Sequence, residues 1–339
     1  MIGSTSIPAC PICDEPTEAV EQEARSYKTG PPYRLRSCQY CDLQHAGTLS
    51  VPDDLYDHIY ANVSRIPGYN RYAWYQSEIA KQARPLHWLS EQEPAYWFIR
   101  RELDKLPKPA SVLEIGSGLG YLSFALAREG YDATGIDISD QAVSRARALF
   151  GDLYARRDLF TLAADPDRYD AVILTEVIEH VTEPIAFLEA ASALLKPGGP
   201  VLMTTPNKSA APLNACWKTE NPPVHLWWFS ETAIRQMARR AGLSVNFCDF
   251  TPLYTGREPE AGRSRLAGQP AWLDESGNVT QAALDWLAKD DRRQGLTRRL
   301  RSLVPHLHRA ALHAKRRRRS SALIAQRSPT IGAILRKRP

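Results

Sequence analysis

Four cysteines of this chain occur in two close pairs, a spacing that suits metal binding. Cys10 and Cys13 form one C-x₂-C pair, and Cys38 and Cys41 form a second pair after 24 intervening residues. Four thiolates at this spacing suit a closed, tetrahedral zinc site, whereas a redox dithiol needs only one pair. An Asp follows each pair, and Asp tolerates left-handed backbone better than most residues. The sequence therefore predicts a structural zinc ribbon.

A glycine-rich segment follows a short apolar run at 111–115. Gly116, Gly118 and Gly120 would let the backbone approach a ligand closely, although a plain tight turn would also use them. The third glycine comes two residues after the second, not three as in the dinucleotide fingerprint. Glu114 directly precedes the loop, and its charge suits a ligand with cationic groups better than a pyrophosphate.

An acidic residue ends the next expected strand, at 133–138. Asp137 lies 21 residues after Gly116, at the place where an acid can accept both ribose hydroxyls of a bound nucleoside. The alternative role, capping the following helix, is already filled by Ser139.

A group of acids and histidines follows the expected strand at 169–174. On a helical turn Glu176, Glu179 and His180 would share one face, because they stand at i, i+3 and i+4. His225 lies further along the chain, in a Pro- and Trp-rich segment. These side chains could bind a divalent ion, His180 or His225 could act as a metal-free base, or the group could be structural.

Strands and helices alternate from about 110 to 254. This alternation predicts an α/β domain with a parallel sheet that is covered on both faces. We divide the chain into a zinc ribbon, an aromatic-rich helical lid or linker, the α/β domain, an extension and a basic tail, at 1–50, 51–109, 110–254, 255–291 and 292–339.

Taken together, the E-x-G-x-G-x-G loop, the acid after the second strand, the run at 169–174 and the Leu-Lys-Pro-Gly-Gly turn at 195–199 resemble class I S-adenosylmethionine-dependent methyltransferases. The resemblance covers roughly residues 110–250. It implies a seven-stranded Rossmann-like sheet and S-adenosylmethionine as cofactor. The implied cofactor contacts are Glu114, Gly116, Ser117, Gly118, Gly120, Asp137, Ile138, Asp158 and Thr175.

The Glu-x-x-Glu-His segment with its later His resembles ubiquinone-biosynthesis O-methyltransferases and small-RNA 2′-O-methyltransferases. The resemblance implies a divalent ion held by Glu176, Glu179, His180 and His225, with both histidines in catalysis. The ribbon together with the segment around His225 is similar to bacterial methyltransferases that modify sugars and glycans. We therefore expect O-methylation of a sugar, a glycan or another polyhydroxylated small molecule. An RNA-modifying enzyme and a non-catalytic binding module are the alternatives.

Charge is unevenly distributed along the chain. Of the 43 Lys and Arg, 15 lie between Arg292 and Pro339, and none of the 38 Asp and Glu does. Such a segment suggests binding to an anionic membrane surface or, less readily, to nucleic acid, and a solvated tail is the alternative. No apolar run approaches the length of a membrane span, and no secretory signal is visible. We expect a cytoplasmic protein, peripheral at the inner face of the membrane if the tail binds lipid.

Overall fold

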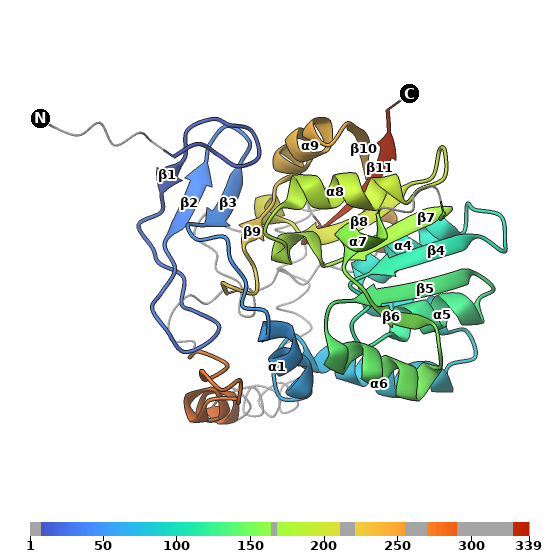
Figure 1. Ribbon diagram of the computed structural model, residues 1–339, viewed down its shortest axis with the longest axis horizontal. Coiled ribbons are helices and arrows are strands. Elements are labelled where there is room, and N and C mark those ends of the chain that lie inside the picture. The colour runs from blue at the N-terminus through green and yellow to red at the C-terminus, as the bar shows by residue number, and fades with distance from the viewer. Residues whose placement is uncertain (1–7, 164–167, 211–220, 255–269, 290–327, 339) are drawn as a thin grey trace, which may run out of the picture.

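Two sheets organise the protein in the computed structural model, which describes residues 8–163, 168–210, 221–254, 270–289 and 328–338 (Figure 1). The smaller sheet has the order β1-β2-β3-β9 and its strands are Glu18–Ala19, Leu35–Cys38, Leu43–Ala46 and Trp227–Trp228. The larger sheet has the order β10-β11-β8-β7-β4-β5-β6. In chain order its strands are β4 (Ser111–Ile115), β5 (Asp132–Asp137), β6 (Tyr154–Arg156), β7 (Ala171–Thr175), β8 (Val201–Pro206), β10 (Leu243–Phe247) and β11 (Thr330–Lys337).

The larger sheet confirms the predicted seven-stranded, Rossmann-like architecture. β4 pairs in parallel with β5 on one side and with β7 on the other, so the strand order reverses at β4. The sheet is mixed rather than wholly parallel, because β11 runs antiparallel to both β8 and β10. In open α/β sheets the crevice outside the carboxyl ends of the strands, at such a reversal, is the usual ligand site.

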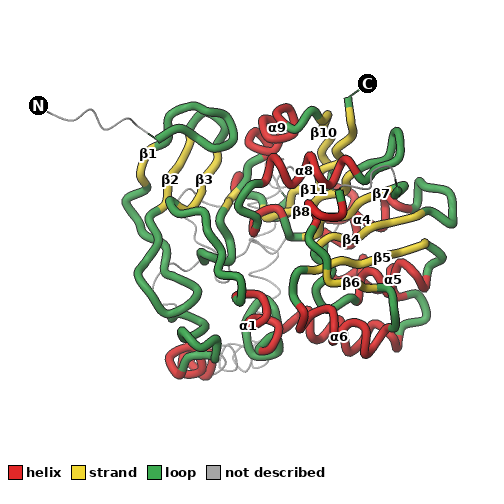
Figure 2. The backbone as a smooth tube through the Cα atoms, viewed as in Figure 1, coloured by secondary structure: helices red, strands yellow, loops and turns green. Residues whose placement is uncertain are grey.

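The central strands are mostly buried because helices cover both faces of the larger sheet (Figure 2). In β7, Val172 and Leu174 pack into one core and Ala171 and Ile173 into the other. α8 (Pro184–Ala193) and α9 (Glu231–Arg240) contribute to the first core, and α3 (Pro85–Gln92), α4 (Pro94–Leu103) and α5 (Tyr121–Arg128) contribute to the second.

Two helices begin at a serine, one of them Ser139, the cap expected from the sequence. Ser139 accepts a hydrogen bond from the Ala142 backbone N–H at the start of α6 (Asp140–Phe150). Ser230 does the same for Ala233 at the start of α9. Each hydroxyl satisfies a backbone donor that the first helical turn leaves without a partner, which fixes where the helix begins.

One element lies where the sequence analysis placed a basic tail. Thr330–Lys337 forms β11, which lies between β8 and β10 with Ile331, Ala333 and Leu335 buried. Alternate side chains of this segment fill the core, whereas its arginine and lysine residues lie toward the exposed end. The assignment of 292–339 to a tail is therefore wrong for this strand. Residues 290–327, which hold most of the basic residues of the predicted tail, lie outside the described part of the chain.

The segment before β4 is helical, as its aromatic-rich sequence predicts. It holds α1 (Leu55–Ala61), α2 (Asn70–Glu78), the short η1 (Ile79–Lys81), α3 and α4. Residues 270–289, from the predicted extension, pack on α1 through Trp272 and Leu273. The remaining short elements are α7 (Leu159–Leu162), η2 (Ile178–His180), η3 (Lys208–Ala210) and α10 (Thr251–Tyr254). Among the described residues, no helix is both long and apolar enough to cross a lipid bilayer.

Candidate active site

A cavity of about 760 Å³ opens at the carboxyl ends of β4, β5 and β7. Its wall includes the glycine loop, the ends of β5 and β7, η2, His225 and tyrosines from α1 and α2. The cavity thus occupies the strand-order reversal at β4, where α/β sheets bind ligands. Nearly all the predicted site residues of the α/β domain line it: Glu114, Gly116, Ser117, Gly118, Asp137, Ile138, Asp158, Thr175, Glu176, Glu179, His180 and His225.

The glycine loop has a backbone that side chains would obstruct. Gly116, Gly118 and Gly120 all have positive φ, of 72°, 51° and 81°. A Cβ on Gly116 would come within 2.6 Å of the Val177 side chain, and one on Gly120 within 2.7 Å of Tyr154. Because both approaches are shorter than a Cβ contact allows, the loop requires glycine for packing as well as for conformation.

Two buried acids lie on either side of this loop. Glu114 accepts a hydrogen bond of 2.5 Å from the Ser123 hydroxyl, and burial raises its pKa to about 8. Asp137 accepts the backbone N–H of Gly118 at 2.8 Å and that of Ser139 at 2.9 Å, and burial also raises the pKa of Asp137. Each carboxylate oxygen of Asp137 has a further lone pair, which leaves capacity to accept a ligand hydroxyl.

The part of the cavity wall next to α7 combines polar and apolar groups. Asp158 caps α7 by accepting the backbone N–H of Phe160 at 2.9 Å, and it also lines the cavity. Ile138 and Phe160 both line the cavity and are about half exposed, an unusual position for large apolar side chains. Phe160 was not among the residues predicted from the sequence, because its exposure depends on how α7 packs.

Glu179, His180 and His225 form a compact group whose potential ligand atoms all lie within 4.8 Å of one another. Glu179 is fully buried and accepts a hydrogen bond of 2.9 Å from the Thr205 hydroxyl. The two imidazole rings are 4.5 Å apart between centroids and nearly perpendicular. Nε2 of His180 lies 3.9 Å from Oε1 of Glu179.

Both histidines of this group are held in the neutral form. Burial lowers the pKa of His180 to about 4, and burial together with the neighbouring His180 lowers the pKa of His225. Nδ1 of His180 lies 2.6 Å from the Val224 carbonyl, which can only accept, so the ring proton is on Nδ1 and Nε2 offers a lone pair. Neutral imidazoles beside a carboxylate are a donor set suited to a divalent cation.

Glu176 does not join this group, although the sequence analysis placed it on the same helical face. No continuous helix forms there: Glu176 has a left-handed backbone with φ of 54°, and only the single turn η2 follows. Its carboxylate lies in the same cavity, and burial raises its pKa to about 7. The i, i+3, i+4 spacing therefore brought two of the three predicted side chains together, and His225 joined them from a separate segment.

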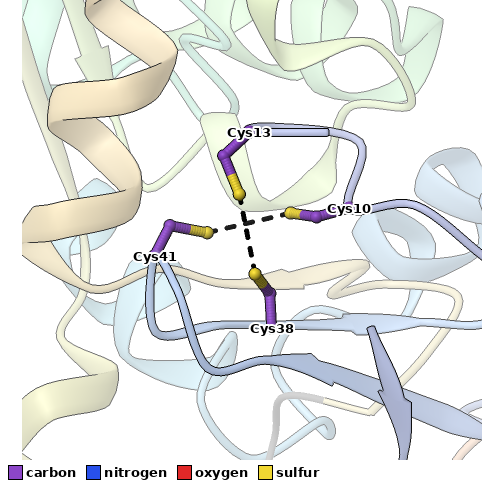
Figure 3. A group of neighbouring side chains, drawn as sticks. All are labelled: Cys10, Cys13, Cys38 and Cys41. Atoms are coloured by element: carbon purple, nitrogen blue, oxygen red, sulfur yellow. Dashed lines mark hydrogen bonds between the residues drawn. The ribbon is translucent and has the colours of Figure 1, made fainter. Parts of the chain in front are cut away.

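The four paired cysteines converge as predicted (Figure 3). The Sγ atoms of Cys10 and Cys41 are 3.7 Å apart and those of Cys13 and Cys38 are 3.6 Å apart. Sulfurs on a tetrahedral zinc at about 2.3 Å lie roughly 3.8 Å from one another, whereas a disulfide needs about 2.05 Å. The spacing therefore fits a metal ion.

The residue that follows each cysteine pair has left-handed backbone, as expected of a metal knuckle. Asp14 has φ of 65° and Asp42 has φ of 54°. The turns that carry the cysteines are thus in place without the glycine that commonly occupies this position.

The small sheet that carries the cysteines also holds the segment that carries His225. β9 begins two residues after His225 and pairs antiparallel with β3. The neighbouring Leu226 is fixed on both sides: its N–H donates to the Glu179 carbonyl at 2.9 Å, and its carbonyl accepts from the Ala46 N–H at 2.8 Å. His225 is thereby positioned jointly by the cysteine-bearing sheet and by the loop after β7.

Arg71 and several tyrosines complete the wall of the cavity. The tyrosines belong to the helices before β4 and to α5: Tyr56, Tyr60, Tyr69, Tyr72, Tyr96 and Tyr121. The sequence analysis recognised the aromatic segment but did not single out Arg71, because nothing in the local pattern distinguishes it from a surface arginine.

Comparison with known proteins gives a consistent match to this part of the chain. The family described as "Methyltransferase domain" matches residues 89–246. The "Ubiquinone biosynthesis O-methyltransferase" of Xanthomonas campestris pv. campestris (strain B100) is 37% identical over 134 residues, which are 38% of this chain and 54% of the relative. The Xylella fastidiosa (strain 9a5c) protein of the same name is 37% identical over 137 residues, or 38% and 53%. The chain thus spans about half the length of these curated relatives.

Solved structures show a weaker likeness. An S-adenosylmethionine-dependent methyltransferase from Mesorhizobium loti has a TM-score of 0.41 and 22% sequence identity, and the match covers 50% of this chain and 94% of that one. A magnesium protoporphyrin IX methyltransferase from Synechocystis PCC 6803 has a TM-score of 0.38 and 19% identity, covering 59% and 91%. Scores this low carry no conclusion about the function of this chain.

Proposed function

Because this chain carries a class I S-adenosylmethionine-dependent methyltransferase domain, we propose that it transfers the cofactor's methyl group to a hydroxyl oxygen of a polyhydroxylated small molecule, sugar or glycan. The observation that carries this proposal is the position of Glu179, His180 and His225 in the same cavity as the glycine loop. A hydroxyl bound at these side chains would face the cofactor's sulfonium. The reaction is an in-line displacement, to which a protein contributes alignment and exclusion of water.

The cofactor is assigned to the end of the cavity formed by β4 and β5. We propose that the glycine loop, with Ser117, holds the methionine part, and that Asp137 accepts the ribose hydroxyls through its remaining lone pairs. Ile138, Asp158 and Phe160 would surround the adenine. Glu114 lies behind the loop, where its carboxylate would oppose the positive charge of the cofactor, and Thr175 lies at the end of β7.

We propose that Glu179, His180 and His225 hold a divalent ion. The buried Glu179 and the two imidazoles fit such an ion, because Oε1 of Glu179 and Nε2 of His180 lie 3.9 Å apart and the potential ligand atoms of all three residues lie within 4.8 Å of one another. When bound, the ion would lower the pKa of the acceptor hydroxyl and orient neighbouring hydroxyls. Thr205 and the Val224 carbonyl fix the directions of Glu179 and His180 from outside, as partners of metal ligands commonly do.

We further propose that the four cysteines hold zinc in a purely structural site. Four thiolates fill a tetrahedral shell and leave no position for a substrate. The relatives named as ubiquinone biosynthesis O-methyltransferases support transfer to oxygen, since that reaction is the one their name states.

The proposal is tested by methyl transfer from radiolabelled S-adenosylmethionine to pairs of acceptors. Each pair has one compound with two neighbouring hydroxyls and one with a single hydroxyl, for example catechol with phenol and cis-1,2-cyclohexanediol with cyclohexanol. We expect transfer to the first member only, loss of transfer after dialysis against a chelator, and recovery on addition of Mg²⁺, Mn²⁺ or Zn²⁺. Full activity in the chelator would exclude the metal, and no affinity for S-adenosylmethionine would exclude the function as a whole.

A further inference from the structure

Arg71 lies in the cavity wall but has no role in the reaction proposed above. Arg71 comes from α2 and lines the cavity among tyrosines, with about 40% of its side chain exposed. A charged group beside aromatic rings is costly unless it is paired, and an ion pair of this kind gives little net stability compared with well-packed apolar residues. Its presence in the wall of a ligand cavity therefore calls for a functional explanation.

The guanidinium group of Arg71 is held in one orientation. Its Nη1 donates to the Gly68 carbonyl at 2.7 Å and its Nη2 donates to the Tyr72 hydroxyl at 2.7 Å. Its Nε lies 2.8 Å from a Glu93 carboxylate oxygen, and its Cζ lies 4.4 Å from the centre of the Tyr72 ring. A guanidinium fixed in this way loses little conformational freedom when it binds a ligand.

These contacts leave part of the guanidinium available. The group has five N–H donors, and the hydrogen bonds to Gly68 and Tyr72 use one donor on each Nη atom, whereas the contact of Nε with Glu93 is an ion pair without hydrogen-bond geometry. One N–H remains on each Nη atom. Two such donors form a planar fork that matches the two oxygens of a carboxylate or a phosphate.

The acidic groups around Arg71 still allow it to bind an anionic group that a ligand carries. Glu93 is the paired acid, and its carboxylate also accepts the Tyr75 hydroxyl at 2.6 Å, so its charge is shared. Glu176 is the other acid near Arg71, and burial raises its pKa to about 7, so its charge is reduced in the neutral range.

We propose that Arg71 binds an oxyanion, a carboxylate or a phosphate, carried by the methyl acceptor. The acceptor is then a hydroxylated acid: its hydroxyl lies at Glu179, His180 and His225, its anionic group lies on Arg71, and its ring or carbon chain lies against the tyrosines of the wall. This inference rests on the proposed function, because it places the acceptor in the same cavity as the cofactor.

The test measures binding rather than turnover, so that its failure is separate from failure of the methyl-transfer proposal. Glucose, glucuronate and glucose 6-phosphate are titrated into the full chain saturated with S-adenosylhomocysteine, with saturation-transfer NMR as the readout. The two acids distinguish a carboxylate from a phosphate as the preferred group. We expect at least one of them to bind about 10- to 100-fold more tightly than glucose, the range for a charge-assisted bidentate contact.

Variants assign the effect to Arg71. Arg71→Gln should remove the preference for the acids and Arg71→Lys should keep part of it. The double variant Arg71→Gln/Glu93→Gln removes both charges and so avoids a buried acid without its partner. Arg156→Gln, which replaces another arginine of the same cavity, serves as the control and should keep the preference. The same profile for all three ligands in the wild type and in Arg71→Gln, with S-adenosylhomocysteine still bound, would overturn the inference.

Discussion

The protein brings together two groups of side chains that could hold a metal ion, and the two groups differ in chemistry and in access. Cys10, Cys13, Cys38 and Cys41 offer four sulfurs, three of them on fully buried residues, and they belong to the core beneath α9. Glu179, His180 and His225 offer one carboxylate and two imidazoles, and they line the large cavity. We propose that the first group fills a coordination shell and that the second leaves room for a ligand.

On this proposal, the difference separates a stabilising site from a reactive one. A closed tetrahedral site contributes to folding, whereas a site with three protein ligands keeps a position for substrate or water. The two groups are also connected, because β9 joins the cysteine-bearing sheet two residues after His225. Removal of one group should therefore affect stability, and removal of the other should affect the reaction.

The largest effect is expected from the closed site. Cys38→Ser should abolish binding of one zinc equivalent and lower the thermal midpoint by about 10 °C or more, because a structural zinc contributes several kcal/mol to folding. Zinc content by mass spectrometry and a calorimetric melt provide the measurement. Cys248→Ser is the control, since Cys248 lies outside the cluster and burial raises the pKa of its thiol to about 11. An unchanged zinc content in Cys38→Ser would contradict the closed site.

The next largest effect is expected from the group of Glu179, His180 and His225. Its loss should lower turnover and leave the zinc content unchanged. Glu179→Gln should lower kcat by about 10²- to 10³-fold, because it removes the anionic ligand, with the affinity for S-adenosylmethionine and the single zinc equivalent unchanged. Glu183→Gln, at an exposed acid on the rim of the same cavity, should keep its activity. Should Glu179→Gln turn over at the wild-type rate, this group would have no part in the reaction.

Sequence alone predicts the closed site more completely than the open one. Two C-x₂-C pairs determine their own ligands, because each knuckle is local and only the meeting of two knuckles depends on the fold. The open site depends on backbone that the pattern does not reveal: Glu176 adopts a left-handed conformation, so the expected helical face does not form. Arg71 was missed because α2 reaches the cavity only through tertiary packing.

The same contrast applies to the strands. β4 and β7 could be predicted because both faces are buried, which makes each one a short and mainly apolar run. β11 was missed because it follows a long basic segment and pairs with β8 more than 120 residues earlier in the chain. Its Ile331, Ala333 and Leu335 were the signal that could have identified it.

A smaller effect should show that the cavity releases a proton when the cofactor binds. Without cofactor, Glu114 is mostly protonated at pH 7, because burial raises its pKa to about 8. A bound sulfonium and amine favour the carboxylate, so binding at pH 7 should release a proton, and affinity should increase as the pH rises from about 6 to 8. Calorimetry in phosphate and in Tris, which differ in ionisation enthalpy, measures the release.

Replacement of this acid should remove that signature. Glu114→Gln should bind with the same apparent enthalpy in both buffers and with about tenfold lower affinity. Asp132→Asn, at an exposed acid of β5, should still release the proton. A buffer-dependent enthalpy that persists in Glu114→Gln would assign the proton to another group.

The smallest effect tests whether the cysteine-bearing sheet also helps to position His225. Asp42 contacts Lys208 and Ser209 after β8, whereas Asp14 contacts Arg240 on α9. Both acids have left-handed backbone, which Asn tolerates, and both are substantially exposed, so each substitution should cost less than about 1 kcal/mol of stability.

If the cysteine-bearing sheet positions His225 through β9, Asp42→Asn should lower turnover about two- to fivefold with its zinc retained, and Asp14→Asn should not. Steady-state kinetics alongside zinc analysis separates the two variants. Equal turnover in both would limit the closed site to stability, because a connection through β3 and β9 would then carry no measurable part of the alignment at His225.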